Sequence, residues 1–218
     1  MKIKGVIFDM DGVILDSEKL YVRFWCEAGR FYGFPMEEKH ALSIRSMARP
    51  LASEKLKGVF GNSFDYEAVR TKRVELMDDY IEKNGIEIKE GAKELLLYLT
   101  ESGYKVALAT ATPPKRAERY LKIHDLYKYF DVTVSASMVS VGKPAPDIYL
   151  KAAEMLGISP QSCIALEDSP NGIKSASSAG CVTVMVPDLD KPSDDIIPLL
   201  YDVANGLNDV KRILRELE

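Results

Sequence analysis

The alternation of short apolar runs with helical patterns constrains the fold of this chain more than any other feature of its sequence. Apolar runs rich in β-branched residues occur at residues 3–8, 105–110, 132–135, 162–166 and 182–186. Between them lie amphipathic patterns at residues 90–102, 147–156 and 169–179, each followed by a glycine, which commonly ends a helix. Strands that alternate with helices join in parallel through right-handed crossovers. The sequence therefore predicts an α/β fold in which helices cover both faces of a parallel sheet.

A different kind of region, residues 18–88, interrupts this alternation directly after the first run. It is helical in pattern, dense in Glu, Lys and Arg, and contains no strand candidate. We expect a Rossmann-like, doubly wound core domain (residues 1–16 and 89–218) that carries an inserted α-helical bundle as a cap domain (residues 17–88). Because ligands bind beyond the carboxyl ends of the strands in open α/β sheets, the cap should cover the site as a lid.

Charge and composition narrow the classes of function. The 218 residues carry a formal net charge of −4, without the basic excess that would suit nucleic acid. The apolar runs are too short to span a bilayer, and the strand pattern begins too early to leave room for a signal peptide. Three widely spaced cysteines fit reduced thiols. We expect a cytoplasmic protein that binds no membrane, and a monomer, since nothing marks a dimer interface.

Two aspartates, Asp9 and Asp11, follow the first apolar run. A spacing of two at the end of a strand points both side chains the same way. Two carboxylates held close together need a cation or a shared proton between them. Gly12 then allows a tight turn beside a ligand. The alternative is a turn in which both carboxylates only bond nearby amides.

A second acidic pair, Glu167 and Asp168, follows the apolar run at residues 162–166. Asp168 or Ser169 could serve only as the cap of the next helix. An acidic pair at the same sheet edge as Asp9 would instead complete a shell of oxygen ligands. Hard oxygen ligands without a nearby His or Cys suit Mg²⁺, which also accepts phosphate oxygens.

Thr110 and Lys143 complete the set of candidate site residues. Thr110 ends another apolar run with a helix behind it, where its hydroxyl and the following amides, that of Ala111 first, could bind a phosphate oxygen. Lys143 lies between Gly142 and Pro144, which immobilise it. A fixed ammonium beside carboxylates and a phosphate would neutralise charge that builds up during transfer. The alternative for Lys143 is an exposed loop lysine.

These motifs, in this order and spacing, resemble those of the haloacid dehalogenase superfamily of phosphotransferases. The resemblance is carried by D-M-D-G-V-I-L-D-S from Asp9, Thr110, Lys143-Pro, and E-D-S-P-N-G from Glu167. It runs over residues 3–186 and more loosely to the end, where residues 202–207 resemble the last short strand of the family. The insertion after the first motif and the run K-P-A-P-D are similar to the β-phosphoglucomutase-like branch, whose caps are small helical bundles.

The resemblance implies Mg²⁺-dependent phosphoryl transfer. Asp9 would be the nucleophile that forms an aspartyl-phosphate, and Asp11 would act as general acid and then as general base. Thr110 and Lys143 would hold the transferring phosphoryl group. The metal would be bound by Asp9, the carbonyl oxygen of Asp11, and Asp168, with Glu167 in this shell or just behind it.

The cap holds the candidates for substrate selection. Trp25 occupies the position of a tryptophan in the mutases, and Arg49 resembles their cap arginine, which binds the second, non-transferring phosphate. Arg45 competes with Arg49 for this role. Lys72 and Arg73 are further candidates, although adjacent charges of this kind are more typical of a solvated helix face.

Departures from the mutase pattern favour a phosphatase. Tyr21 stands where the true β-phosphoglucomutases have a histidine, Ser17 replaces a threonine, and P-P-K at residues 113–115 alters a phosphate contact. We therefore expect hydrolysis of a small phosphorylated metabolite, a sugar phosphate. The alternative is a β-phosphoglucomutase that interconverts β-glucose 1-phosphate and glucose 6-phosphate. A non-catalytic binding protein is a remote alternative, because Asp9 and Asp11 are both present.

Overall fold

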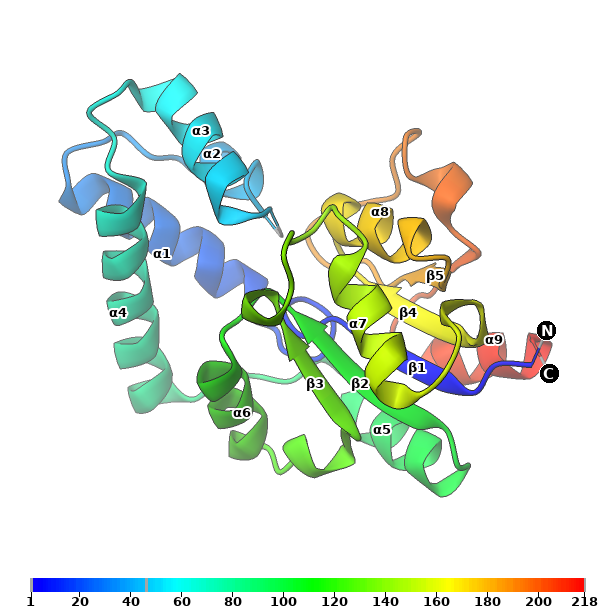
Figure 1. Cartoon of the computed structure of the whole chain (residues 1–218). Helices are drawn as coiled ribbons and strands as arrows, with labels where there is room; N and C mark the ends of the chain where they lie inside the picture. The colour runs from blue at the N-terminus through cyan, green and yellow to red at the C-terminus, as the bar shows by residue number, and fades with distance from the viewer. Residues whose placement is uncertain (1, 46, 218) are drawn as a thin grey trace.

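A computed structural model of the chain describes residues 2–45 and 47–217. Its central layer is a six-stranded sheet of order β3-β2-β1-β4-β5-β6, in which every neighbouring pair of strands is parallel (Figure 1). The strands are β1 (Gly5–Phe8), β2 (Lys105–Thr110), β3 (Val132–Ser135), β4 (Cys163–Glu167), β5 (Val182–Met185) and β6 (Asp202–Val203). The predicted parallel α/β sheet is confirmed, and β1 lies near its centre between β2 and β4.

Helices cover both faces of the sheet. They are α5 (Ala92–Glu101), α6 (Pro114–Ile123), α7 (Asp147–Leu156), α8 (Pro170–Ser178) and α9 (Val210–Glu216). Short 3-10 helices lie in the connections, at Tyr127–Tyr129, Ala136–Met138, Pro160–Ser162, Ile197–Leu199 and Leu207–Asp209.

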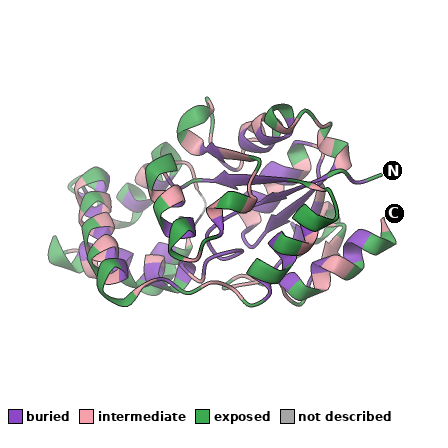
Figure 2. Ribbon diagram, turned by 90° about the horizontal axis from the view of Figure 1, so that it is seen from below, coloured by how far each residue is buried: buried purple, intermediate pink, exposed green. Residues whose placement is uncertain are grey.

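Alternate residues of β1 face opposite sides of the sheet, as the two-residue period of a strand requires. Val6 and Phe8 belong to the apolar core shared with α5, α6 and α9, whereas Ile7 belongs to the core shared with α7 and α8. Figure 2 shows the central strands as a mostly buried layer between helices that are exposed on their outer sides. The runs are almost uniformly apolar because both faces of the sheet are covered.

The last strand is shorter than predicted. Residues 202–207 were expected to form it, but β6 ends at Val203, where it pairs with Met185 of β5. Asn205 and Gly206 follow, and both residue types are depleted in strands. A 3-10 helix then begins at Leu207 and leads into α9.

The cap is helical, as predicted. It contains α1 (Glu18–Phe31), α2 (Glu38–Leu42), α3 (Arg49–Phe60) and α4 (Tyr66–Asn84). These helices share an apolar cluster of their own, which includes Trp25, Leu56 and Val69. Figure 1 shows α1 and α4 side by side, with α2 and α3 across the upper end of the cap.

The chain crosses between core and cap at two adjacent segments. The backbone N–H of Asp16 donates to the carbonyl of Glu87 at 2.9 Å, and that of Lys89 donates to the carbonyl of Ile14 at 2.8 Å. Leu15 and Ile88 form a β-bridge between these bonds. On this basis we propose the division into a core (residues 1–16 and 89–218) and a cap (residues 17–88).

The cysteines are unpaired and buried at Cys26, Cys163 and Cys181, as free thiols were expected to be. Within residues 2–45 and 47–217, no helix is both long enough and apolar enough to cross a bilayer. The cytoplasmic location and the monomeric state stay predictions.

Candidate active site

The carboxyl ends of the central strands bring the predicted site residues together. Phe8 of β1 pairs with Leu166 of β4, so Asp9 comes next to Glu167, and the backbone N–H of Asp9 donates to the carbonyl of Leu166 at 2.9 Å. Asp168 follows directly. All three carboxylates are buried, and each offers an oxygen within 4.8 Å of the others.

Lys143 is buried between two of these carboxylates. Its Nζ lies 2.6 Å from Oδ1 of Asp9 and 2.6 Å from Oε1 of Glu167, and it donates to the carbonyl of Ala109 at 3.2 Å. Burial alone would lower the pKa of Lys143, but Asp9 and Glu167 outweigh it and raise that pKa above its ordinary value. Lys143 therefore stays a cation, and the alternative of an exposed loop lysine is wrong.

Glu167 is fixed from two further directions. The hydroxyl of Tyr149, on α7, donates to Oε1 at 2.6 Å. A Cβ at position 172 would lie 2.0 Å from the carboxyl group, so only glycine lets α8 begin this close. Tyr149 was not predicted, because nothing in its position on an amphipathic helix distinguishes it from a core aromatic residue.

Asp11 is held by hydroxyl groups rather than by a cation. Ser17 Oγ donates to its Oδ1 at 2.6 Å, and Thr112 Oγ1 donates to its Oδ2 at 2.9 Å. The hydroxyl of Tyr21 lies 3.1 Å from Thr112 Oγ1. Burial raises the pKa of Asp11, although the bonds from Ser17 and Thr112 oppose the rise. Asp11 thus holds a proton more readily than an exposed aspartate does.

Thr110 lies at the end of β2 and is fully buried. Its Oγ1 accepts the backbone N–H of Thr112 at 3.0 Å, so it shapes the turn that presents Ala111 and Thr112 to the cavity. Thr112 was not predicted, although its place two residues after Thr110 at the same strand end is a signal for a site residue.

The acidic cluster fits a divalent cation. Oδ1 of Asp168 is buried and has no hydrogen-bond partner, so no donor in the described chain uses its lone pairs. Gly12, at φ +81°, brings the loop after β1 so close that a Cβ there would lie 2.3 Å from Oδ2 of Asp168. Three buried carboxylates with oxygen ligands alone are the donor set that suits Mg²⁺.

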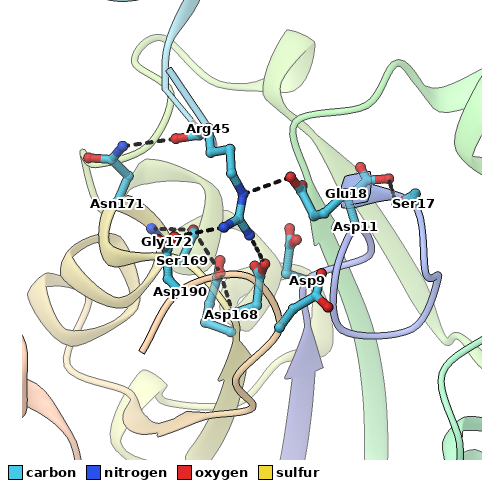
Figure 3. Close-up of polar contacts among 12 residues, drawn as sticks. Asp9, Asp11, Ser17, Glu18, Arg45, Asp168, Ser169, Asn171, Gly172 and Asp190 are labelled. Atoms are coloured by element: carbon cyan, nitrogen blue, oxygen red, sulfur yellow. Dashed lines mark hydrogen bonds and ion pairs between the residues drawn. The ribbon is translucent and has the colours of Figure 1, made fainter. Parts of the chain in front are cut away.

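Arg45 reaches from the cap into these carboxylates (Figure 3). Its Nε donates to Glu18 at 2.7 Å, its Nη1 to Asp190 at 2.7 Å, and its Nη2 to Oδ2 of Asp168. The carbonyl of Arg45 accepts from Asn171 of α8 at 3.0 Å. The guanidinium is neutralised by three carboxylates, which favours Arg49 over Arg45 as a ligand for a substrate phosphate.

A cavity of about 130 Å³ lies between the core and the cap. Asp9, Asp11 and Ala111 line its core side. Trp25 and Arg49 line its cap side, where we expected substrate-binding residues. This volume is below the roughly 300–1,000 Å³ of pockets for drug-sized ligands, and so suits a small metabolite.

Arg73 also lines the cavity and is buried, so the interpretation of this residue as part of a solvated helix face is wrong. Its guanidinium lies over the rings of Tyr21 and Trp25, with its central carbon 4.7 Å and 5.4 Å from their centroids. Lys72 does face outward, where it bonds Glu75 at 3.2 Å.

Comparisons with known proteins show the family of the chain. The model of the haloacid dehalogenase-like hydrolase family matches residues 3–180. A phosphorylated carbohydrates phosphatase of Thermotoga maritima is 32% identical over 97% of this chain and 90% of the relative. Hexitol phosphatase A of Escherichia coli is 32% identical over 100% of this chain and 93% of the relative.

Solved structures show the same architecture. The crystal structure of a β-phosphoglucomutase from Clostridium difficile superposes with a TM-score of 0.80 at 25% identity, and the match covers 99% of this chain and 96% of that one. The resemblance drawn from the sequence motifs is thereby confirmed: the chain belongs to the haloacid dehalogenase-like hydrolase family.

Proposed function

We propose that this chain hydrolyses a small phosphorylated carbohydrate through an aspartyl-phosphate on Asp9. The observation that carries the proposal is the pair of aspartates on one cavity with different surroundings. Asp9 is bound by the ammonium of Lys143, whereas Asp11 is bound only by neutral hydroxyls. Burial raises the pKa of both aspartates, but at Asp9 the charge of Lys143 opposes the rise. An adjacent ammonium favours a carboxylate that attacks, whereas hydroxyl partners alone suit a carboxyl that gives and takes a proton.

In the first half-reaction, a carboxylate oxygen of Asp9 attacks phosphorus and the bond from phosphorus to the ester oxygen breaks. Asp11 gives its proton to that oxygen, and the alcohol leaves. The raised pKa of Asp11 supports its protonated form before transfer. Thr110 and the amide of Ala111 hold the phosphoryl oxygens at the turn after β2.

In the second half-reaction, water attacks phosphorus and Asp11 takes the proton of this water. The bond from phosphorus to the Asp9 carboxylate breaks, which regenerates Asp9 and releases inorganic phosphate. Lys143 remains charged throughout and stabilises the oxygens that gain negative charge.

Asp9, Asp168 and the carbonyl of Asp11 would hold Mg²⁺, with Glu167 in this shell or beside it. The bound ion supplies positive charge that offsets the charge of the phosphoryl group. The partnerless Oδ1 of Asp168 and the oxygen-only donor set support this assignment.

Hydrolysis is favoured over mutase chemistry by the relatives and by Tyr21. The phosphatases named above are 32% identical to this chain, whereas the mutase structure is 25% identical. Burial raises the pKa of Tyr21, so its hydroxyl remains neutral near Asp11, where the mutases have a histidine that titrates. A β-phosphoglucomutase stays the second candidate, because Trp25 and Arg49 line the cavity at the positions that resemble mutase residues.

A paired assay tests the two candidates. Phosphate release is measured on a panel of sugar phosphates with Mg²⁺, beside a coupled assay for glucose 6-phosphate from β-glucose 1-phosphate with a bisphosphate primer. We expect release of free phosphate from at least one ester. We also expect glucose 6-phosphate to form no faster than free phosphate is released. Faster formation of glucose 6-phosphate than of free phosphate would overturn hydrolysis in favour of the mutase.

A further inference from the structure

A second cavity, of about 300 Å³, lies beside the cavity that Asp9 lines. Its cap side is formed by residues 47–50, at the start of α3, and its core side mainly by residues 135–143, between β3 and α7. The two sides are joined by the backbone N–H of Ala48, which donates to the carbonyl of Lys143 at 3.1 Å (Figure 1). The second cavity is therefore enclosed while the cap lies on the core.

The second cavity continues from the first. The residues that line both come in pairs from the cap and from the core: Met47, Arg49, Ala111 and Pro113. Asp11, the proposed donor of a proton to the ester oxygen, lines the first cavity, so the leaving alcohol begins there. That cavity of about 130 Å³ is below the roughly 300 Å³ at which pockets for larger ligands begin. A longer alcohol therefore has to extend past the shared residues into the second cavity.

Small and apolar side chains form one part of the wall of the second cavity. They are Ala48 and Pro50 of the cap, and Ala136 and Ile148 of the core. Gly142 adds no side chain, and a Cβ there would lie 3.5 Å from the Cβ of Ala48. Such a wall favours the burial of carbon-bound hydrogens.

Serine hydroxyls form another part of the wall, at Ser135, Ser137 and Ser140. Ser135 Oγ lies 3.0 Å from Ser137 Oγ, whereas the hydroxyl of Ser140 has no partner within the described chain. The charged residues of the described wall are Arg49, at the boundary with the first cavity, and Lys143, whose ammonium is bound by two carboxylates. Apolar walls with a few polar groups bind neutral ligands and fix their orientation.

We infer that the second cavity binds the far end of the leaving alcohol, a neutral, polyhydroxylated carbon chain longer than that of glycerol. The inference rests on the proposed function, since it concerns the alcohol of the same ester. Carbon-bound hydrogens of the chain pack against Ala136 and Ile148, and its hydroxyls bond Ser137 and Ser140. The core segment between β3 and α7 thus selects the substrate together with the cap, although the sequence predicted selection by the cap.

A series of polyol phosphates tests this inference. Phosphate release is measured on the terminal monophosphates of ethylene glycol, glycerol, erythritol, ribitol and sorbitol, which differ in the number of hydroxylated carbons. We expect kcat/KM to rise by roughly tenfold or more from the glycerol ester to the sorbitol ester, the lower end of what a methylene group contributes in an apolar pocket. Equal or falling values along the series would overturn the inference.

Variants that fill the second cavity locate the effect. Ser140→Phe should lower kcat/KM for the sorbitol ester roughly tenfold more than for the ethylene glycol ester, because the ring occupies the space that the longer chain needs. Ala136→Leu repeats the test from a less exposed part of the wall. Val141→Phe is the matched control, since Val141 is next to Ser140 in the chain, is 54% exposed and does not line the cavity. Equal losses on both esters in Ser140→Phe and Ala136→Leu, or the same selective loss in Val141→Phe, would overturn the assignment.

The Asp9→Asn variant separates this inference from the proposed function. In that variant, binding of the sorbitol and ethylene glycol esters is measured by calorimetry without turnover. Tighter binding of the sorbitol ester that Ser140→Phe abolishes supports the second cavity, even if phosphate release fails to depend on Asp9. Turnover that depends on Asp9 but not on the length of the alcohol contradicts the role of the second cavity alone.

Discussion

Asp11 lies in a chain of hydroxyl groups that runs from Ser17 on one side to Thr112 and Tyr21 on the other. A bond donated to a carboxylate stabilises its charged form and so lowers its pKa. Burial acts in the opposite direction and is the stronger effect. The protonation of Asp11 is therefore adjusted by its neighbours.

Replacing Thr112 with Val should shift the pH dependence of turnover. The variant loses the donor to Oδ2, which stabilises the charged form, so the pKa of Asp11 should rise further above its ordinary value. The alkaline limb of kcat/KM, where the general acid loses its proton, should move to higher pH by the same amount. Thr100→Val, which removes a hydroxyl bonded only within α5, is the control. An unmoved limb in Thr112→Val would contradict the role of Asp11 as the acid.

For single residues, the sequence predicts which side chains take part in the reaction better than it predicts what surrounds a side chain. Five residues could be predicted to lie in the site, because each follows a strand or is fixed between Gly and Pro: Asp9, Asp11, Lys143, Glu167 and Asp168. The burial of Arg73 could not be predicted, because it depends on how α4 packs against α1, which no local pattern encodes. Its neighbour Lys72 has a similar charge and faces outward.

At the scale of elements, Arg45 connects the cap to α8 and to the loop that carries Asp190. Arg45→Met should destabilise the metal-free protein by about 3–5 kcal/mol, because it leaves the carboxylates of Glu18 and Asp168 buried without their cation. Urea unfolding measures the loss. Added Mg²⁺ should restore part of it, since the ion offsets the same charge.

Arg23→Met is the control for this prediction, because Arg23 pairs with Glu27 on the exposed side of α1. Surface ion pairs contribute at most about 1 kcal/mol. A loss in Arg45→Met as small as that in Arg23→Met would contradict the buried network.

Glu18, at the start of α1, should make the stability of the protein depend on pH. Burial raises the pKa of Glu18 from 4.5 to about 7, opposed by Arg45 and supported by the charges of Asp11 and Asp188. The folded chain therefore binds a proton that the unfolded chain has released between these values. The free energy of unfolding should fall as pH rises from 4.5 to 7, with at most about 1.4 kcal/mol per pH unit from this group.

Urea unfolding in metal-free buffer across this pH window measures the slope. Glu18→Gln should flatten it, whereas Glu27→Gln, on the exposed face of the same helix, should not. An unchanged slope in Glu18→Gln would contradict the assignment of the proton to Glu18.

The ends of helices and strands were predictable where the sequence has residue types that are typical of such ends. The helix α7 has the predicted bounds, because Pro146 precedes it and Gly157 ends it in a left-handed conformation. The strand β6 was predicted too long, because a two-residue pairing at a sheet edge leaves almost no periodic pattern.

For the whole molecule, Mg²⁺ should stabilise the folded chain by binding it and not the unfolded chain. At a concentration about 100 times its Kd, the ion should add roughly 2.7 kcal/mol to the free energy of unfolding. Thermal unfolding with Mg²⁺ and with chelator measures the difference. Asp168→Asn should abolish it, and Asp195→Asn, which alters an exposed carboxylate, should retain it. Equal gains in both variants would place the ion elsewhere.

The aspartyl-phosphate on Asp9 is the central claim, and trapping it is the most direct test. In Asp11→Asn, attack by Asp9 on acetyl phosphate needs no proton for the leaving group, whereas hydrolysis of the intermediate lacks its base. After an acid quench and digestion, mass spectrometry should locate one phosphoryl group on Asp9. A phosphoryl group on another residue, or none while phosphate is still released, would contradict the account.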